Sequence, residues 1–435
     1  MTTRALSPLE RWYDVADRIS PLNVTGRLTV HGRVDVAALR RGLNAMQCIH
    51  PLARVAVAGD GPGRRFVSTA TPIPLRVVTA ADPDEIVARE LTERVDAGTG
   101  PLLRATAVPA ADGTTTDLVL SVSHRVADGT TLLSLLHDWV ECAAGIAPPP
   151  RAGLPPTEEL FPTLTQGLAG EAAADRKARD DRADLARYRP GRVVADRVVS
   201  HSDRRTGLVR REITGTQLAT LVAACRAVGV SVHGLLGAVL ARVVGRESAA
   251  GWVTLGSPID FRAELDPPVD RHEMGSFVAT LPTLVDTTQD PWAAAAAVST
   301  DLTARRGRGE HFSMITALGR AAPATPEEAG PFLDDLDRNG PINLCLTNLG
   351  VCGVPDRIGP WPVTGAQFAA GISVVGLLVA AVTTHGGVLS VNLTYVLGAV
   401  GTARVTRLAD EWLAEVALLV AGVVRTDGEP SGAAR

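Results

Sequence analysis

The sequence predicts an α+β protein made of two layered domains. Its 435 residues exceed the usual size of one domain, and 46% of them are hydrophobic, which is enough for two cores. Each half mixes apolar strand-like runs with amphipathic helices. A Pro-rich and then highly charged segment separates the two halves, and such a composition favours a solvated connection.

These patterns predict the domain boundaries. We expect an N-terminal domain over 1–145 and a linker or long crossover with a solvated helix over 146–195. A C-terminal domain over 196–425 and a flexible tail over 426–435 complete the prediction.

In the first half, apolar residues alternate in short runs and recur at helical spacing in longer ones. Asp35 precedes one helical run and is a suitable N-cap. The Gly-rich stretch from Gly59 lacks the Lys-Ser/Thr of a phosphate-binding loop, so it predicts a hairpin turn. The expected strands are 24–32, 101–110 and 116–124, and the expected helices are 35–47 and 84–95.

The second half has the same mixture of strand-like and helical patterns, but it shows no detectable sequence repeat of the first half. Its helices carry small residues suited to close packing, and one strand ends in a polar cluster around Asp260. The expected strands are 207–214, 251–262, 276–286, 342–351 and 372–396, and the expected helices are 214–229, 231–245, 290–309 and 402–424.

Composition excludes several classes of function. The net charge of −4 argues against a general nucleic-acid binder, which would carry a basic excess. The N-terminus lacks the apolar core of a secretory signal, and the longest apolar stretch, 368–382, is too short for a membrane span. Five scattered cysteines do not form a disulfide pattern. We therefore expect a reduced, cytoplasmic protein without a membrane span.

One histidine stands at an unusual place. Leu118, Leu120, Val122 and His124 share one face of a strand, because strand side chains alternate. After Gly129 the apolar residues change to helical spacing. His124 therefore lies where a buried strand ends and a helix is about to begin.

This placement suits a base. Histidine has an ordinary pKa near ~6.5, so it can accept and return a proton near neutral pH. Asp128 can hold the loop through N–H bonds or an arginine, and Gly129 allows a tight turn with room for substrate. The spacing alone leaves simpler interpretations open: Asp128 as an ordinary helix cap and His124 as a structural residue.

The segment SHRVADG (123–129) resembles the His-x-x-x-Asp-Gly signature of the chloramphenicol acetyltransferase-like superfamily. This superfamily includes peptide condensation domains and polyketide-associated, dimycocerosyl-transferase-like acyltransferases, and the latter branch is the most similar. Further segments resemble the superfamily in the same order along the chain, namely LSPLERW (6–12), 35–57, 229–245, LGSPIDFRAEL (255–265) and LTNLG (346–350).

The resemblance implies a fold and a site. The fold would be two chloramphenicol-acetyltransferase-like α/β sandwich domains that form a pseudo-dimer with a tunnel between them. His124 matches the catalytic histidine, and Asp128 matches an aspartate that pairs with an arginine, here Arg262; Gly129 matches the glycine. Ser257 and Asn348 are candidates for the tunnel wall, with hydrogen bonding at a turn or strand end as the favoured alternative.

The predicted function is acyl transfer from a CoA or carrier-protein thioester to a hydroxyl or amine acceptor in natural-product or lipid biosynthesis. Alternatives are a condensation-type enzyme that forms amides, a non-catalytic docking module and a purely structural interaction protein. We expect no bound cofactor, because the thioester is a substrate, and no metal, because DRHEMG (270–275) is typical of a solvated loop. A partner carrier protein fits this function, and a monomer is compatible with it.

Overall fold

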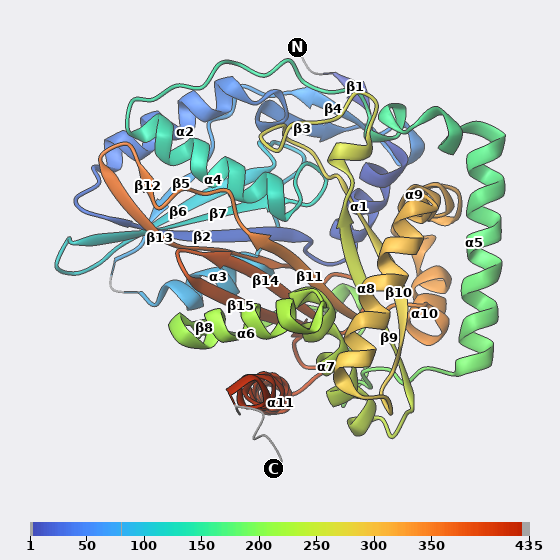
Figure 1. Ribbon diagram of the computed structural model, residues 1–435. Coiled ribbons are helices and arrows are strands. Elements are labelled where there is room, and N and C mark those ends of the chain that lie inside the picture. Colours follow the sequence, from blue (N-terminus) through green and yellow to red (C-terminus); the bar gives the residue numbers. More distant parts are fainter. Residues whose placement is uncertain (1–2, 80, 429–435) are drawn as a thin grey trace.

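The computed structural model describes residues 3–79 and 81–428 and contains two large mixed α/β units side by side (Figure 1). Each unit is built on a six-stranded sheet, and a small three-stranded sheet lies beside the first unit. This arrangement confirms the predicted α+β fold class with two related halves.

The first sheet is mostly antiparallel. Its strands, in spatial order, are β12 (Arg357–Ile358), β13 (Trp361–Ala370), β2 (Asn23–His31), β7 (Thr115–Ser123), β6 (Leu103–Pro109) and β5 (Leu75–Val77). The small sheet contains β1 (Arg4–Ala5), β4 (Arg65–Ser68) and β3 (Val55–Ala58). The Gly-rich stretch at Gly59 connects antiparallel β3 and β4, which confirms the predicted hairpin.

The second sheet combines antiparallel and parallel pairs. Its strands, in spatial order, are β10 (Val278–Asp286), β9 (Trp252–Asp260), β11 (Leu344–Val351), β14 (Leu378–His385), β15 (Val388–Val396) and β8 (Thr206–Thr214). The parallel neighbours are β9 with β11 and β11 with β14.

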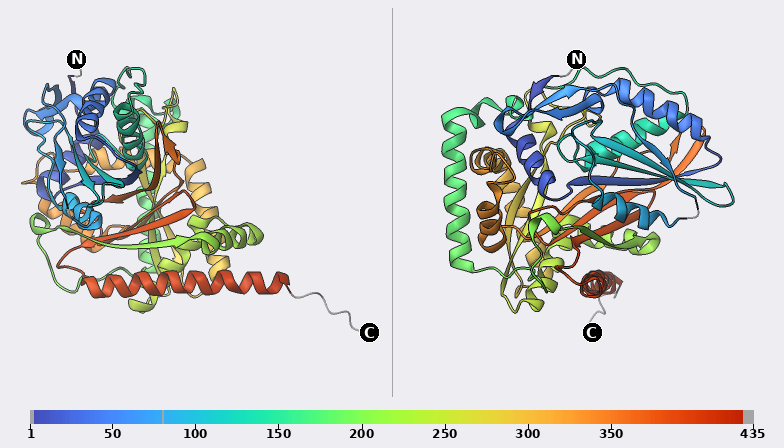
Figure 2. Two further views of the ribbon diagram at one scale, coloured as in Figure 1. Left: turned by 90° about the vertical axis from the view of Figure 1, so that its left-hand side faces the viewer. Right: turned by 180° about the vertical axis from the view of Figure 1, so that it is seen from behind.

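Helices cover both sheets (Figures 1 and 2). Those of the first half are α1 (Pro8–Ile19), α2 (Val36–Ile49), α3 (Pro83–Thr92) and α4 (Gly129–Ala143). The others are α5 (Gly167–Tyr188), α6 (Gly215–Val228), α7 (Val232–Glu247), α8 (Pro291–Gly307), α9 (Glu310–Ala321), α10 (Ala329–Asn339) and α11 (Thr402–Gly428).

The first core follows from the alternation of β7. Leu118, Leu120 and Val122 pack in one apolar cluster with α2 and α4, whereas Val119 packs with α3 on the opposite face. Asp35 caps α2 as predicted, because its Oδ1 accepts a bond of 3.1 Å from the N–H of Ala37.

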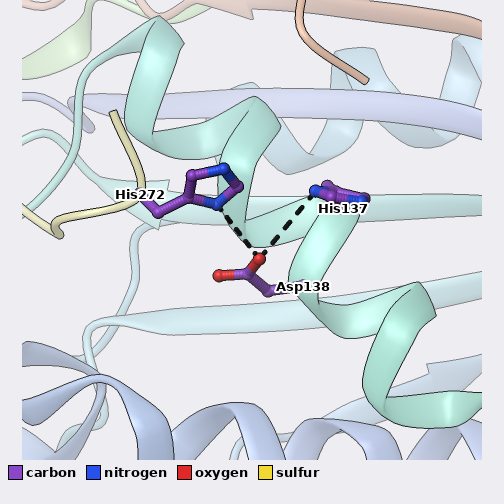
Figure 3. Close-up of side chains that lie close together, drawn as sticks. All are labelled: His137, Asp138 and His272. Carbon is purple, nitrogen blue, oxygen red and sulfur yellow. Dashed lines mark hydrogen bonds and ion pairs between the residues drawn. The ribbon is translucent and has the colours of Figure 1, made fainter. Parts of the chain in front are cut away.

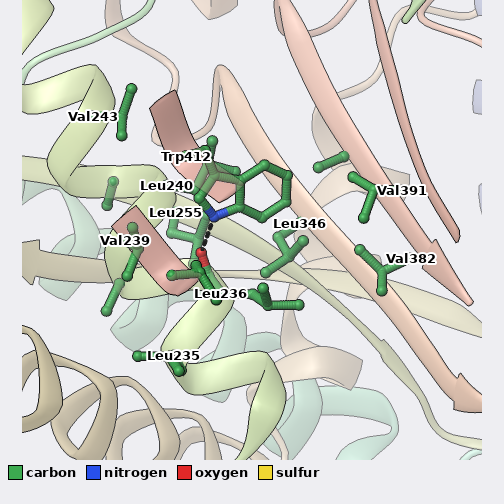
Figure 4. Packing of buried hydrophobic residues seen from close by; sticks show 14 of the residues in the cluster. Leu235, Leu236, Val239, Leu240, Val243, Leu255, Leu346, Val382, Val391 and Trp412 are labelled. Carbon is green, nitrogen blue, oxygen red and sulfur yellow. Dashed lines mark hydrogen bonds between the residues drawn. The ribbon is translucent and has the colours of Figure 1, made fainter. Parts of the chain in front are cut away.

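The second core surrounds α7, whose sequence supplies Leu and Val on several sides. Leu235, Leu236, Val239 and Leu240 are fully buried between the sheet and neighbouring helices (Figure 4). The indole N–H of Trp412 on α11 donates to the carbonyl of Leu236 at 2.9 Å. Burial of these side chains fixes α7 against β9 and β11.

One strand crosses between the predicted domains. Residues 357–370 lie within the predicted C-terminal domain, yet β12 and β13 join the N-terminal sheet, where Ala370 pairs with Val24 and Phe368 with Gly26. The later part of the chain therefore contributes two strands to the sheet of the first half. The boundaries 1–145, 146–195 and 196–425 remain a prediction of how the chain divides.

The charged segment forms a helix on the outside. Helix α5 runs along the edge of the molecule beside α9, and most of its residues are exposed, as expected for a solvated crossover (Figure 1). At the C-terminus, α11 extends through the predicted tail to Gly428, and the rest of that tail lies outside the described residues. The elements that were not predicted are helices α1, α9 and α10 and strands β1, β5, β12 and β13.

Among residues 3–79 and 81–428, no single helix is long and apolar enough to cross a bilayer. By length and composition alone, the pair α6 and α7 passes the same test together, with a bend of 97° between them.

Candidate active site

His124 directly follows β7. Its backbone N–H donates to the carbonyl of Leu22 at 3.1 Å, which continues the pairing of β7 with β2 by one step. The half-buried imidazole stacks on the phenol ring of Tyr13 from α1, with ring centroids 4.4 Å apart and an angle of 16° between the planes. The strand end and the Tyr13 ring together hold the imidazole in one orientation.

The next residue anchors this loop to α1. The guanidinium of Arg125 is 1% exposed and donates to Asp14 at 2.8 Å and to Asp17 at 3.0 Å. A third bond of 2.9 Å reaches the hydroxyl of Ser123. Because α1 also carries Tyr13, this buried network fixes the aromatic ring and the histidine loop relative to each other.

Asp128 connects the loop to the second half of the molecule. It caps α4 by accepting a 2.9 Å bond from the N–H of Thr131 on Oδ1, and Oδ2 accepts a 2.8 Å bond from the N–H of Phe277. Oδ1 also accepts a hydrogen bond of 2.9 Å from Nη2 of Arg262, so Asp128 and its predicted partner Arg262 form an ion pair. Both charged groups are almost completely buried, and Asp260 also pairs with Arg262, at 2.8 Å.

The contacts of Asp128 also lower the pKa of its carboxyl group. Burial by itself would raise the pKa of Asp128, but the Arg262 guanidinium and the N–H donors of Thr131 and Phe277 outweigh it and hold the pKa below the ordinary value. Asp128 is thus an ionised residue that joins three segments of chain, and it is not positioned as a proton donor.

Burial lowers the pKa of His124 below its ordinary value of 6.5, and the nearby Asp128 carboxylate and backbone carbonyls oppose this only in part. The imidazole is therefore neutral at neutral pH, which is the form that accepts a proton. Burial also raises the pKa of Tyr13 to about 12, so its ring stacks as a neutral phenol.

The glycine of the motif is required by a close approach. A Cβ added at Gly129 would lie 2.9 Å from Cε2 of Phe368 and 3.2 Å from Cδ1 of Leu349. Gly129 is not among the glycines with positive φ, so the expected tight turn is not the reason. The reason is that β13 and β11 from the later part of the chain reach the start of α4.

A cavity of about 530 Å³ lies in front of His124. Its wall combines residues of both halves, and most of them are apolar; Tyr13, His124, Gly129, Ala279, Asn348 and Phe368 are among them. A volume of this size suits a small-molecule substrate, and the few polar groups of the wall would orient it.

The two candidates for the tunnel wall differ. Asn348 lines the cavity, with its Oδ1 accepting a 2.8 Å bond from the N–H of Gly350. Ser257 does not line it: the residue is fully buried, and its hydroxyl lies 3.0 Å from Nε2 of His233. Its placement on the substrate passage is therefore corrected. The side chain turns from the interior of β9 toward His233 on α7.

We expect Gly129→Ala to impair activity through Phe368. The new methyl group would push the aromatic ring out of place at the cavity wall, and a misplacement of this kind can lower kcat/KM by about 10²-fold. Gly330→Ala is the matched control, because a Cβ there meets nothing within 4 Å in α10. Kinetic assays of both variants test this, and unchanged activity of Gly129→Ala would show that the space is not needed.

Sequence reasoning missed several residues of the site. Thr131 lies two positions after the motif glycine. Its hydroxyl accepts a hydrogen bond of 2.6 Å from Arg262 and donates one of 2.7 Å to the carbonyl of Gly275. Tyr13 and Phe368 are more than 100 residues from His124 along the chain, so no local pattern links them to it. Only the resemblance of 6–12 to an opening segment pointed toward α1.

Known structures share this architecture. Polyketide synthase associated protein 5 from Mycobacterium tuberculosis has 16% identity and a TM-score of 0.69, covering 96% of this chain and 98% of that one. The first condensation domain of the calcium-dependent antibiotic synthetase, in complex with a substrate analogue, has 17% identity and a TM-score of 0.70 over 97% and 96%. The epimerization domain of tyrocidine synthetase B, third module, has 15% identity and a TM-score of 0.67 over 98% of both chains.

These similarities show a condensation-type fold with two chloramphenicol-acetyltransferase-like halves. Within it, residues 202–352 match the family described as phthiocerol/phthiodiolone dimycocerosyl transferase C-terminus. The resemblance inferred from the sequence is thereby confirmed. No curated protein matches the chain.

Proposed function

We propose that this protein is an acyltransferase that moves an acyl group from a thioester of CoA or of a carrier protein to a hydroxyl or amine acceptor, with His124 as the general base. The observation that supports it most strongly is the position of a neutral, oriented imidazole on the wall of a cavity between two halves. The matched transferase family supports the same class of reaction.

In the proposed reaction, the acceptor hydroxyl or amine attacks the thioester carbonyl while His124 takes its proton. The tetrahedral intermediate then collapses, the carbon–sulfur bond breaks, and His124 returns the proton to the departing thiolate. Backbone N–H groups of Gly129 and Thr130, at the positive end of α4, are suited to stabilise the oxyanion. No covalent bond to the enzyme forms, so positioning in the cavity supplies much of the acceleration.

The organisation of the loop supports roles for the other motif residues. Asp128, paired with Arg262, acts as a positioning residue that fixes the loop bearing His124 and the start of α4. Asn348 contributes a polar group to the cavity wall. We infer that the cavity is part of the expected tunnel, which would admit the donor from one face and the acceptor from the other.

The experiment that tests this function supplies acyl-CoA and acyl-carrier-protein donors with hydroxyl and amine acceptors, and follows thiol release together with product mass. An ester or amide product formed only with acceptor present supports acyl transfer. Products with amines alone would favour the condensation-type alternative, which the similarity to condensation domains supports. Capture of a carrier protein without any thioester consumption would favour a non-catalytic docking module.

The lowered pKa of His124 predicts the acidic limb of the pH profile. The base form must be neutral, and burial keeps it neutral to a lower pH than free imidazole. We therefore expect kcat/KM to fall to half its maximum at a pH below 6.5 as the pH decreases. Rates measured with a substrate that does not titrate between pH 5 and 8 check this, and a midpoint above 6.5 would contradict it.

A further inference from the structure

A cluster of two histidines and an aspartate lies on the side of α4, about two and a half turns after Gly129 of the motif. His137 and Asp138 are neighbours on the helix, and His272 comes from the loop that leads to β10 (Figure 3). Nδ1 of His272 is 3.2 Å from Oδ1 of Asp138, and Nδ1 of His137 is 4.0 Å from the same oxygen. Potential ligand atoms of the three side chains all lie within 4.8 Å of one another.

The buried charge at the centre of this cluster has an unusual set of partners. Asp138 is 1% exposed, and among the described residues its ion-pair contacts are all histidines: His50 at 2.8 Å, His272 and His137. Most buried carboxylates of this protein face an arginine instead, as Asp14 and Asp128 do. Imidazole nitrogens and carboxylate oxygens are both common ligands of divalent cations, so this set of side chains is chemically suited to hold one.

The outer contacts orient the ligand atoms toward one point. Nε2 of His50 lies 2.8 Å from Oδ2 of Asp138, which leaves Oδ1 directed to the other two histidines. Nε2 of His137 lies 3.4 Å from Oε1 of Glu141, one turn later on α4, which leaves Nδ1 directed to Asp138. Carboxylates and histidines in this outer position are typical of metal centres, where they fix the orientation and basicity of the ligands.

We propose that His137, Asp138 and His272 bind one divalent transition-metal ion, with Zn²⁺ the best match to two imidazoles and a carboxylate. Bonds of about 2.0–2.2 Å would bring the three ligand atoms to roughly 3.3 Å from one another. The side chains of His137 and His272 are 16% and 26% exposed, so their rotation can bring the ligand atoms to this distance while Asp138 stays in place. Solvent at the same side can supply the fourth ligand.

The ion would join α4 to the loop 266–277. This loop already follows the helix: Thr131 donates to the carbonyl of Gly275 at 2.7 Å and Ser134 to that of Arg271 at 3.1 Å. The same loop carries Phe277, whose N–H holds Asp128. A bound ion would therefore stiffen a connection between the two halves, and this holds whatever reaction the cavity performs.

The test is a titration of the untagged, metal-stripped protein with Co²⁺, followed by its visible absorption, and then competition with Zn²⁺. We expect one Co²⁺ per chain, absorption bands of a four-coordinate site, displacement by Zn²⁺ and a higher Tm with Zn²⁺ bound. His272→Gln and His137→Gln should each lose the bands. Glu141→Gln, which removes only an outer contact, should lower the affinity by about 10–100-fold.

The matched control is His201→Gln, because His201 is also a half-buried histidine beside an aspartate, Asp337 at 3.0 Å. It should bind Co²⁺ like the parent, and far-UV circular dichroism checks that each variant is folded. The proposal is overturned if the parent shows no stoichiometric Co²⁺ site, or if His272→Gln and His137→Gln bind as tightly as the parent.

Discussion

Asp128→Asn should lower the free energy of unfolding by about 3–5 kcal/mol, because the buried Arg262 would lose its charged partner. The amide could still accept one N–H bond, but its NH2 group would face either the guanidinium or the N–H of Phe277, which are both donors. Only the more exposed Asp260 would remain beside Arg262. Urea denaturation of parent and variant measures the difference.

Asp260→Asn is the matched control for this charge. Its carboxylate contacts the same guanidinium at 2.8 Å but is 40% exposed, so its removal should cost only about 0–1 kcal/mol. The double variant Asp128→Asn with Arg262→Met should lose less stability than the two single variants summed, since no unpaired charge remains. A fully stable but inactive Asp128→Asn would contradict the positioning role and make Asp128 a chemical participant.

His124→Ala should lower kcat by about 10²–10⁴-fold, the usual contribution of a general base. KM should change little, because the imidazole acts on the proton that moves in the transition state and most of the cavity wall stays intact. The truncated site opens to the cavity, so added imidazole should restore part of the rate. Steady-state assays with the best donor and acceptor pair measure both effects.

His31→Ala is a suitable control, since His31 lies at the far end of β2 and its Nε2 contacts only the hydroxyl of Thr364 at 2.7 Å among the hydrogen bonds of the described chain. Its kcat should equal that of the parent. If His124→Ala turned over as fast as the parent, the proposed base would be wrong even though the cavity could still bind substrate.

Local patterns in the sequence predict much of the fold. The alternation of 116–124, the cap at Asp35 and the helical run after Gly129 correspond to β7, α2 and α4. These features depend on neighbours along the chain, so propensity and periodicity are sufficient to find them. The same reasoning placed His124 at the end of a strand.

What local patterns could not supply is the set of contacts between distant segments. The pairing of Asp128 with Arg262 was expected only from the resemblance to a known superfamily. The stacking of Tyr13 on His124 and the crossing of β13 into the first sheet depend on tertiary packing. The sequence around His272 predicts only a solvated loop. Its contact with Asp138 joins residues 134 positions apart, so no local pattern indicates it.

The most direct test of the central claim counts products in one incubation. Parent protein and His124→Ala are each mixed with an acyl thioester and an acceptor that the parent uses, and free thiol and acylated acceptor are measured together. We expect the parent to release thiol and form product in a one-to-one ratio, and His124→Ala to remain close to the uncatalysed rate. Equal product from both proteins would contradict proton transfer by His124 in the cavity.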